Sequence, residues 1–203
     1  IMKCSRGFMW FGTRDGLNKY DGYTFTIYRP DPNNPYSLSD NAITALLEGR
    51  DGSLWIGTGS GGLNRYDRQK DRFIHYQYDP GDPSSISSDH IQALFLDRAG
   101  QLWIGTSGGG LNRFDDENES FVRYQNDPQD PQSLSNNNVV AIQEDRSGTL
   151  WIGTLGGGLN RLYHPELSNP NADSLSLGRA SHSDSVQISQ PFFIQYKHEN
   201  NLP

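Results

Sequence analysis

The sequence predicts an all-β protein, a β-propeller built of four-stranded antiparallel blades. The four tryptophans, Trp10, Trp55, Trp103 and Trp151, occupy one position of a repeat whose copies are 45 to 48 residues apart, a period typical of propellers or solenoids. The composition combines 22 glycines and 11% aromatic residues with only 33% hydrophobic residues, which favours many short strands joined by tight turns. No segment shows a convincing amphipathic helix period.

The copy around Trp151 shows how each repeat is expected to fold. We predict strands at residues 138–145, 149–154, 159–162 and 192–196, which form an antiparallel meander. In the second strand of the copies, neighbouring residues such as Trp55 and Ile56 point to opposite faces, yet both are apolar. This pattern is typical of a sheet that is covered on both faces, as blades stacked around an axis are.

The repeats divide the chain into consecutive blades of one partial β-propeller, residues 1–203. We place the blades at residues 1–36 (blade one), 37–84 (blade two), 85–132 (blade three) and 133–197 (blade four). Blade four contains an insertion rich in serine and asparagine, residues 164–190, to which we assign no structure. Residues 198–203 start a fifth unit.

Blade one departs from the other copies in two respects. Ile1 aligns with Leu46, so most of its innermost strand is missing. Cys4 stands where the other copies have Gly49, Asp97 and Asp145.

Four blades are the lower end of the range for propellers, which is about four to eight, and we expect an incomplete ring from a larger propeller. An arc leaves one apolar blade face uncovered at each end, and such faces bind missing blades, a partner or a second copy of the chain. We therefore predict self-association in dilute solution, measurable by light scattering. A stable monomer would contradict this prediction.

The glycine-rich segment GTSGGG at residues 105–110 raises the question of phosphate binding. A nucleotide site of the common types places a helix N-terminus after the glycines, whereas here a strand follows and no Lys-Ser/Thr pair is present. We expect Gly108, Gly109 and Gly110 to allow positive φ angles in a strand-to-strand turn.

A second shared segment, of the type DPxxPxSxSx(N/D), joins successive blades. The aspartates of this segment could suggest a calcium site, but the ligand spacing of a calcium loop is absent. These aspartates are Asp31, Asp79, Asp82, Asp127 and Asp130. Asp-Pro pairs and serines instead favour turns closed by side-chain hydrogen bonds. We predict no metal site and no cofactor.

Charge and composition narrow the range of partners. The net charge of −7 argues against a nucleic-acid partner, because phosphate backbones require clustered lysines and arginines. The single cysteine excludes an internal disulfide. No apolar run approaches the roughly 20 residues of a membrane helix, and we expect no membrane contact by this segment.

The repeated sequence motifs resemble those of a known family. LWIGT followed by GGLNRYD, and the segment RGFMWFGTRDGLNKYDGYTF at residues 6–25, are similar to the two-component regulator propeller repeat. The resemblance covers residues 1–163 and resumes at Pro191. It implies a sensor propeller on the periplasmic or extracellular side of a membrane-anchored bacterial signalling protein. In such proteins further blades, a membrane helix and a histidine kinase or diguanylate cyclase follow, and signalling proceeds by phosphorelay.

We expect ligand binding at one face of the arc, because loops on a rigid scaffold usually carry recognition. In a meander the loops between the second and third strands lie at the same end as the segments that lead into the first strands. Their variable polar positions are the candidate ligand-binding residues: Arg14, Asp15, Asn41, Ser60, Asp89, His90, Ser107 and Asn138. They suit a polar ligand such as a carbohydrate or a peptide. The alternative is that they are exposed turn residues without a ligand.

Three functions remain open at this point. The first is a non-catalytic ligand sensor that passes its signal to a downstream kinase or cyclase. The second is a scaffold for protein interactions. The third is a propeller lyase or hydrolase. The sequence does not favour it, because no histidine falls in a catalytic or metal-binding pattern. The five histidines are His75, His90, His164, His182 and His198. We predict no catalytic residues.

Overall fold

The strand content confirms the predicted fold class. A computed structural model describes residues 1–163 and 191–197; the insertion at 164–190 and the start of the fifth unit at 198–203 lie outside this range. The described residues contain sixteen strands and no helix. The strands form four antiparallel sheets of four strands each, and in every sheet the strand order follows the chain.

Each sheet is one blade. Blade one contains β1 (Met2–Lys3), β2 (Met9–Thr13), β3 (Gly16–Tyr20) and β4 (Phe25–Tyr28). Blade two contains β5 (Ile43–Glu48), β6 (Leu54–Thr58), β7 (Leu63–Asp67) and β8 (Arg72–Tyr76). Blade three contains β9 (Ile91–Leu96), β10 (Leu102–Thr106), β11 (Leu111–Asp115) and β12 (Ser120–Tyr124). Blade four contains β13 (Val139–Glu144), β14 (Leu150–Thr154), β15 (Gly158–Tyr163) and β16 (Phe192–Tyr196).

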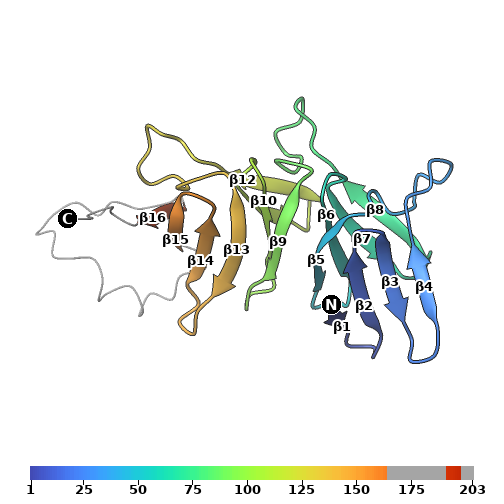
Figure 1. Ribbon diagram of the computed structural model, residues 1–203. Helices are drawn as coiled ribbons and strands as arrows, with labels where there is room; N and C mark the ends of the chain where they lie inside the picture. The colour runs from blue at the N-terminus through green and yellow to red at the C-terminus, as the bar shows by residue number, and fades with distance from the viewer. Residues whose placement is uncertain (164–190, 198–203) are drawn as a thin grey trace, which may run out of the picture.

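The blades follow one another along an arc (Figure 1), with blade one at one end and blade four at the other. The first strands of blades two to four lie side by side, since β5 contacts β9 and β9 contacts β13. In blade one the first strand has only two residues, and β2 makes the contact with β5 instead. The arc is open within the described part of the chain.

The hydrophobic core is divided into three clusters, and each cluster lies between two consecutive blades. Trp10 packs into the cluster of blades one and two, Trp55 into that of blades two and three, and Trp103 into that of blades three and four. All three side chains are buried. The equivalent Trp151 is half-buried, because no described blade lies against its face. The tryptophans therefore join blades.

Both ends of the arc expose apolar side chains. On blade one, Phe25 and Ile27 are 58% and 51% exposed. On blade four, Leu159 and Tyr196 are 41% and 47% exposed. Inside the arc, the corresponding surfaces are covered by the next blade. The apolar end faces expected from the sequence are present.

A buried asparagine on the third strand anchors each linking segment. Asn112 is 0% exposed; its Oδ1 accepts a hydrogen bond from the Ser87 N–H at 3.0 Å, and its Nδ2 donates to Ser87 Oγ at 2.7 Å. The same pair of bonds joins Asn64 to Ser39 and Asn160 to Ser135. A buried amide needs such partners, since an unpaired polar group in a core is costly. The repeated serine of the linking segment is therefore structural.

The glycine prediction needs one correction. Gly108 and Gly110 have φ angles of +81° and +86°, as expected, but Gly109 is not in the positive region. Gly109 is required for space instead, because a Cβ atom there would lie 2.5 Å from Ser87 Oγ and 2.7 Å from the Ser87 carbonyl oxygen. The third glycine lets the loop pack onto the linking segment.

The turn between β13 and β14 makes the stability of the protein dependent on pH. Partial burial acts to raise the pKa of Asp145, but hydrogen bonds from Ser147, from the Trp151 indole at 2.8 Å and from the Thr149 N–H outweigh it and lower that pKa from 3.8 to about 2. A lowered native pKa stabilises the fold above the unfolded-state value, and this stabilisation is lost as the pH falls from about 4 through about 2.

We expect Asp145→Asn to remove this part of the acid sensitivity. Because solvent screens a partly exposed carboxylate, the expected loss of stability at neutral pH is about 1 kcal/mol. Urea unfolding at a series of pH values measures it. A variant whose stability falls between pH 4 and pH 2 as steeply as that of the parent would contradict this account.

Candidate functional site

The predicted loops do share one face of the arc, and backbone hydrogen bonds join them from blade to blade. We call loop face the surface made by the β2–β3, β6–β7, β10–β11 and β14–β15 loops with the segments that lead into β5, β9 and β13. In blade one, the Gly16 N–H donates to the Asn41 carbonyl of blade two at 2.8 Å. In the same way Gly62 bonds to Asp89 at 3.0 Å, and Gly110 bonds to Asn137 at 2.8 Å. The tip loops of blades one, two and three are thus each held by the next blade.

A second set of bonds holds the tip loops of blades two, three and four to their own blades. The Gly59 N–H donates to the Ala42 carbonyl at 2.8 Å, and the Ser107 N–H donates to the His90 carbonyl at 2.9 Å. Leu155 repeats the contact with Asn138 at 2.8 Å. The tip loops and leading segments that carry the eight candidate residues are therefore fixed relative to one another.

Five of the eight candidate side chains form a hydrogen bond or an ion pair with a neighbouring residue. In four of them, Ser60, Asp89, Ser107 and Asn138, hydrogen bonds hold two segments of the loop face together. Ser60 donates to Asp40 Oδ2 through both its N–H and its Oγ at 2.8 Å. Asp89 Oδ1 accepts from the Tyr78 N–H at 2.8 Å. Ser107 Oγ lies 3.1 Å from Asn138 Oδ1.

The fifth engaged side chain is Asp15, whose carboxylate pairs with the Arg29 guanidinium at 2.6 Å. Both partners are largely exposed. An exposed ion pair of this kind contributes little to stability, at most about 1 kcal/mol. It can open at small cost when a ligand competes for either group.

The carboxylate under the tip of blade two is ionised at neutral pH. Partial burial acts to raise the pKa of Asp40, but hydrogen bonds from the Ser60 hydroxyl and from the Ala42 and Ser60 N–H groups outweigh it and hold the pKa below 3.8. Asp40 thus adds a negative charge to the loop face while it fixes the tip.

The remaining three candidates are free to contact a ligand. Arg14, Asn41 and His90 are exposed, and their side chains form no hydrogen bond with the described residues. Arg14 and Asn41 lie on adjoining loops, since the bond from Gly16 joins those loops. His90 lies under the tip of its own blade, next to Ser107. Together they present a guanidinium, an amide and an imidazole.

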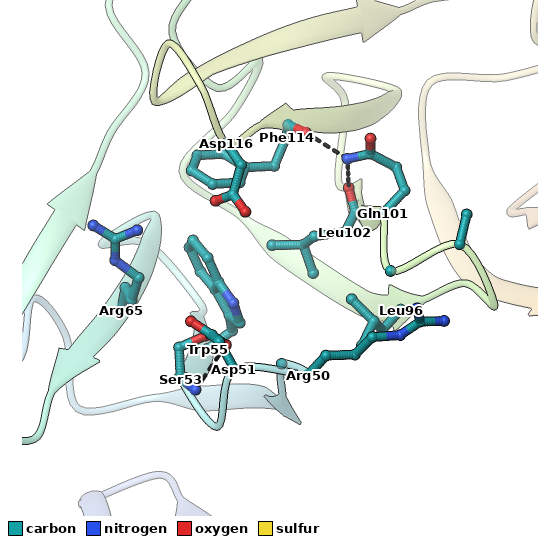
Figure 2. A pocket seen from close by; sticks show the side chains of 13 residues that line it. Arg50, Asp51, Ser53, Trp55, Arg65, Leu96, Gln101, Leu102, Phe114 and Asp116 are labelled. Atoms are coloured by element: carbon teal, nitrogen blue, oxygen red, sulfur yellow. Dashed lines mark hydrogen bonds between the residues drawn. The ribbon is translucent and has the colours of Figure 1, made fainter. Parts of the chain in front are cut away.

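The structure also contains a pocket that the candidate residues do not include. It lies between blades two and three, where the β5–β6 and β9–β10 turns meet, and therefore on the face opposite the loop face (Figure 2). Its volume is about 350 Å³. Trp55 and Phe114 line it together with charged side chains, among them Arg50, Asp51 and Asp116. In the sequence, the pocket is indicated by Gly49, which has no side chain at the position where blades three and four have Asp97 and Asp145.

No group of three or more metal-ligating side chains occurs among residues 1–163 and 191–197. No helix in the same residues is long and apolar enough to cross a membrane.

Comparisons with known proteins confirm the predicted resemblance. Residues 37–60, 85–108 and 133–156 match the two component regulator propeller family. A solved extracellular domain assigned to the hybrid two component system BT3049 of B. thetaiotaomicron is similar, with a TM-score of 0.73 and 28% identity over 83% of this chain. A 33-residue segment is 61% identical to Histidine kinase P4 of Formosa agariphila and covers 16% of this chain. This chain spans only 23% of the solved domain, and the segment spans 2% of the kinase.

A similar fold also occurs in a protein of lower sequence identity. Catalytically inactive virginiamycin B lyase from Staphylococcus aureus covers 84% of this chain with a TM-score of 0.53 and 17% identity. At that identity the likeness concerns the fold alone.

Proposed function

We propose that this chain, which carries two component regulator propeller repeats, is part of the ligand-sensing region of a two-component signalling protein and lies on the periplasmic or extracellular side of the membrane. The observation that carries the proposal is the similarity of the repeats and of the whole arc to an extracellular domain of such a system. The downstream histidine kinase or cyclase lies elsewhere in the parent protein.

The loop face is the surface where we propose that a small polar ligand, such as a carbohydrate, binds. Arg14 and His90 supply donors, while Asn41 supplies a donor and an acceptor. The tip loops are fixed by hydrogen bonds between blades, so a ligand that contacts two blades meets a preorganised surface, which lowers the entropic cost of binding. Such a ligand also biases the relative position of adjacent blades, which is the change that a sensor has to transmit.

A thermal-shift screen tests this proposal. The 203-residue chain is mixed with a library of soluble oligosaccharides and short peptides, and the melting temperature is recorded. We expect one chemical class to raise the melting temperature, and the triple variant Arg14→Ala, Asn41→Ala, His90→Ala to abolish that rise. Lys70→Ala, which removes an exposed cation from the β7–β8 turn on the opposite face, is the matched control and should leave the rise unchanged.

Other outcomes would replace the proposal. A rise that survives in the triple variant moves the site away from the loop face. Turnover of any compound in the library would establish an enzyme instead of a binding module. If no compound acts and a protein partner is captured through the loop face, the chain is an interaction scaffold.

The end faces of the arc are the second interaction surface that we propose. Phe25 and Ile27 on blade one and Leu159 and Tyr196 on blade four are exposed where consecutive blades would otherwise cover them. We propose that further blades of the parent protein, or a second copy of this chain, cover these faces. The light-scattering measurement described above tests the contact between copies.

A further inference from the structure

The three blade junctions differ at the face opposite the loop face, and the difference lies in two carboxylates. At the junction of blades three and four, Asp97 Oδ2 accepts from the Trp103 indole N–H at 2.9 Å. Glu144 accepts from the Arg98 backbone N–H at 2.8 Å, and Glu144 Oε1 also lies 2.5 Å from Arg98 Nε. Two carboxylates thus satisfy three donors.

The junction of blades one and two keeps one of these carboxylates. Glu48, which aligns with Glu144, accepts from the Ser5 N–H at 2.7 Å and from Ser5 Oγ at 2.9 Å. It also pairs with Arg68 at 3.3 Å. Cys4 occupies the position of Asp97, and both Cys4 and Trp10 are buried; the Trp10 indole N–H has no hydrogen-bond partner among the described residues, but it is enclosed by the core.

The junction of blades two and three has neither carboxylate. Gly49 stands at the position of Asp97, and Leu96 stands at the position of Glu144. The substitutions leave three donors without an acceptor among the described residues: the Trp55 indole N–H, the Arg50 backbone N–H and Arg50 Nε. The Arg50 guanidinium still donates to the carbonyl oxygens of Asp97 and Arg98, as Arg98 does to the next blade.

These donors line the pocket of about 350 Å³ (Figure 2). Trp55 as a whole is 4% exposed, and its indole N–H, which forms no hydrogen bond with the described residues, belongs to the pocket lining. A Cβ atom built on Gly49 would lie 3.5 Å from Trp55 Nε1, which places the missing Asp side chain directly beside this donor. A ligand oxygen in the pocket would supply the acceptor that this donor lacks.

The other charged groups of the pocket indicate which second functional group the ligand carries. Asp116 stands where blade two has Arg68, so a carboxylate has replaced a cation at this junction. Burial acts to raise the pKa of Asp51, but hydrogen bonds from Ser53 and the charge of Arg65 outweigh it and hold the pKa below 3.8. The Asp51 carboxylate is therefore ionised, and the Asp116 side chain, which lines the same pocket, can accept from a hydroxyl or ammonium group of the ligand.

We propose that the pocket between blades two and three binds a small carboxylate that also carries a hydrogen-bond donor, such as a hydroxy acid or an amino acid. The ligand carboxylate takes the place of the two missing protein carboxylates and accepts from the Trp55 indole and from Arg50. Its hydroxyl or ammonium group donates to Asp116. The site is separate from the loop face, and its occupation does not depend on the proposed signalling role.

The indole N–H signals of the four tryptophans provide the test. We would titrate the ¹⁵N-labelled 203-residue chain with glycolate, with glycine and with neutral 1,2-ethanediol, and assign the Trp55 signal from the spectrum of Trp55→Phe. Glycolate or glycine should shift the Trp55 signal in a saturable manner. The Trp103 and Trp151 signals should stay in place, because Asp97 and Asp145 already occupy those donors. The stronger of the two ligands shows whether Asp116 meets a hydroxyl or an ammonium group.

Two variants rebuild the missing groups from this chain's own repeats. Gly49→Asp combined with Asp51→Ala copies the turn of blade three, where Asp97 and Ala99 stand. Leu96→Glu restores the carboxylate of Glu48 and Glu144 and changes a half-buried position, so it tests the proposal even if the first variant does not fold. Each should weaken binding by at least about tenfold, which corresponds to the loss of a hydrogen bond to a charged group.

The proposal is overturned if neither acid shifts the Trp55 signal, or if all four indole signals move alike. Equal binding of 1,2-ethanediol would show that the site does not select a carboxylate. Unchanged binding in both variants would place the ligand elsewhere.

Discussion

Replacing Gly110 by alanine should destabilise the protein by about 3 kcal/mol or more, because three effects act together. Gly110 has a φ angle of +86°, which disfavours any residue with a Cβ atom. The added Cβ would overlap the Tyr124 carbonyl oxygen, a backbone atom that cannot move without disturbing β12. The shift needed to relieve this overlap would also break the bond from the Gly110 N–H to the Asn137 carbonyl, which joins blades three and four.

Gly108→Ala is the matched control for this experiment. Gly108 has nearly the same φ angle, +81°, but a Cβ atom there would have no neighbour within 4 Å. We expect a loss of about 1–2 kcal/mol from backbone strain alone. Urea unfolding followed by tryptophan fluorescence gives both values. Equal losses would mean that the contact with Tyr124 and the bond between blades contribute nothing.

Trp103→Ala should cost about 3–5 kcal/mol, as expected for a fully buried aromatic side chain. Trp103 is 0% exposed, and it fills the core between blades three and four. Its removal leaves a cavity and also deprives Asp97, which is 5% exposed, of the indole donor at 2.9 Å. Thermal unfolding followed by circular dichroism measures the loss without depending on the removed fluorophore.

Trp151→Ala provides the comparison, since Trp151 occupies the same repeat position and donates the same bond to Asp145 at 2.8 Å. It is only half-buried, because its face lies at the open end of the described arc. We expect a loss of about 1–2 kcal/mol, in proportion to the smaller apolar area removed from water. A loss as large as that of Trp103→Ala would show that another blade or another copy covers this face in solution.

Most of the fold could be predicted from the repeat. Each of the four tryptophans lies in a segment with the same pattern of apolar residues and glycines. The strands predicted for one segment therefore apply to all four sheets. The order of the strands followed from their succession along the chain, because a meander pairs each strand with the next. The exception was Gly109, whose role is to leave space for Ser87 and not to adopt a positive φ angle.

The candidate site was predicted only in outline. The sequence placed eight polar residues on one face, but it could not separate those that fix the loops from those that remain free. Ser60 and Asp89 are engaged because Asp40 and the Tyr78 N–H lie within hydrogen-bond distance in three dimensions. Arg14 and His90 have no such partner among the described residues.

The sequence by itself determined the blade, since the alternation of apolar residues, the turn glycines and the repeated tryptophan act within one repeat of the chain. The pairing of blades was decided by the tertiary structure. Gly49 of one blade and Leu96 of the next, residues 47 positions apart, line the same pocket, and only this arrangement shows that two carboxylates are missing at one junction. The physical reason is that strand and turn formation depend on neighbouring residues, whereas the environment of the Trp55 indole depends on side chains that meet only when two blades pack.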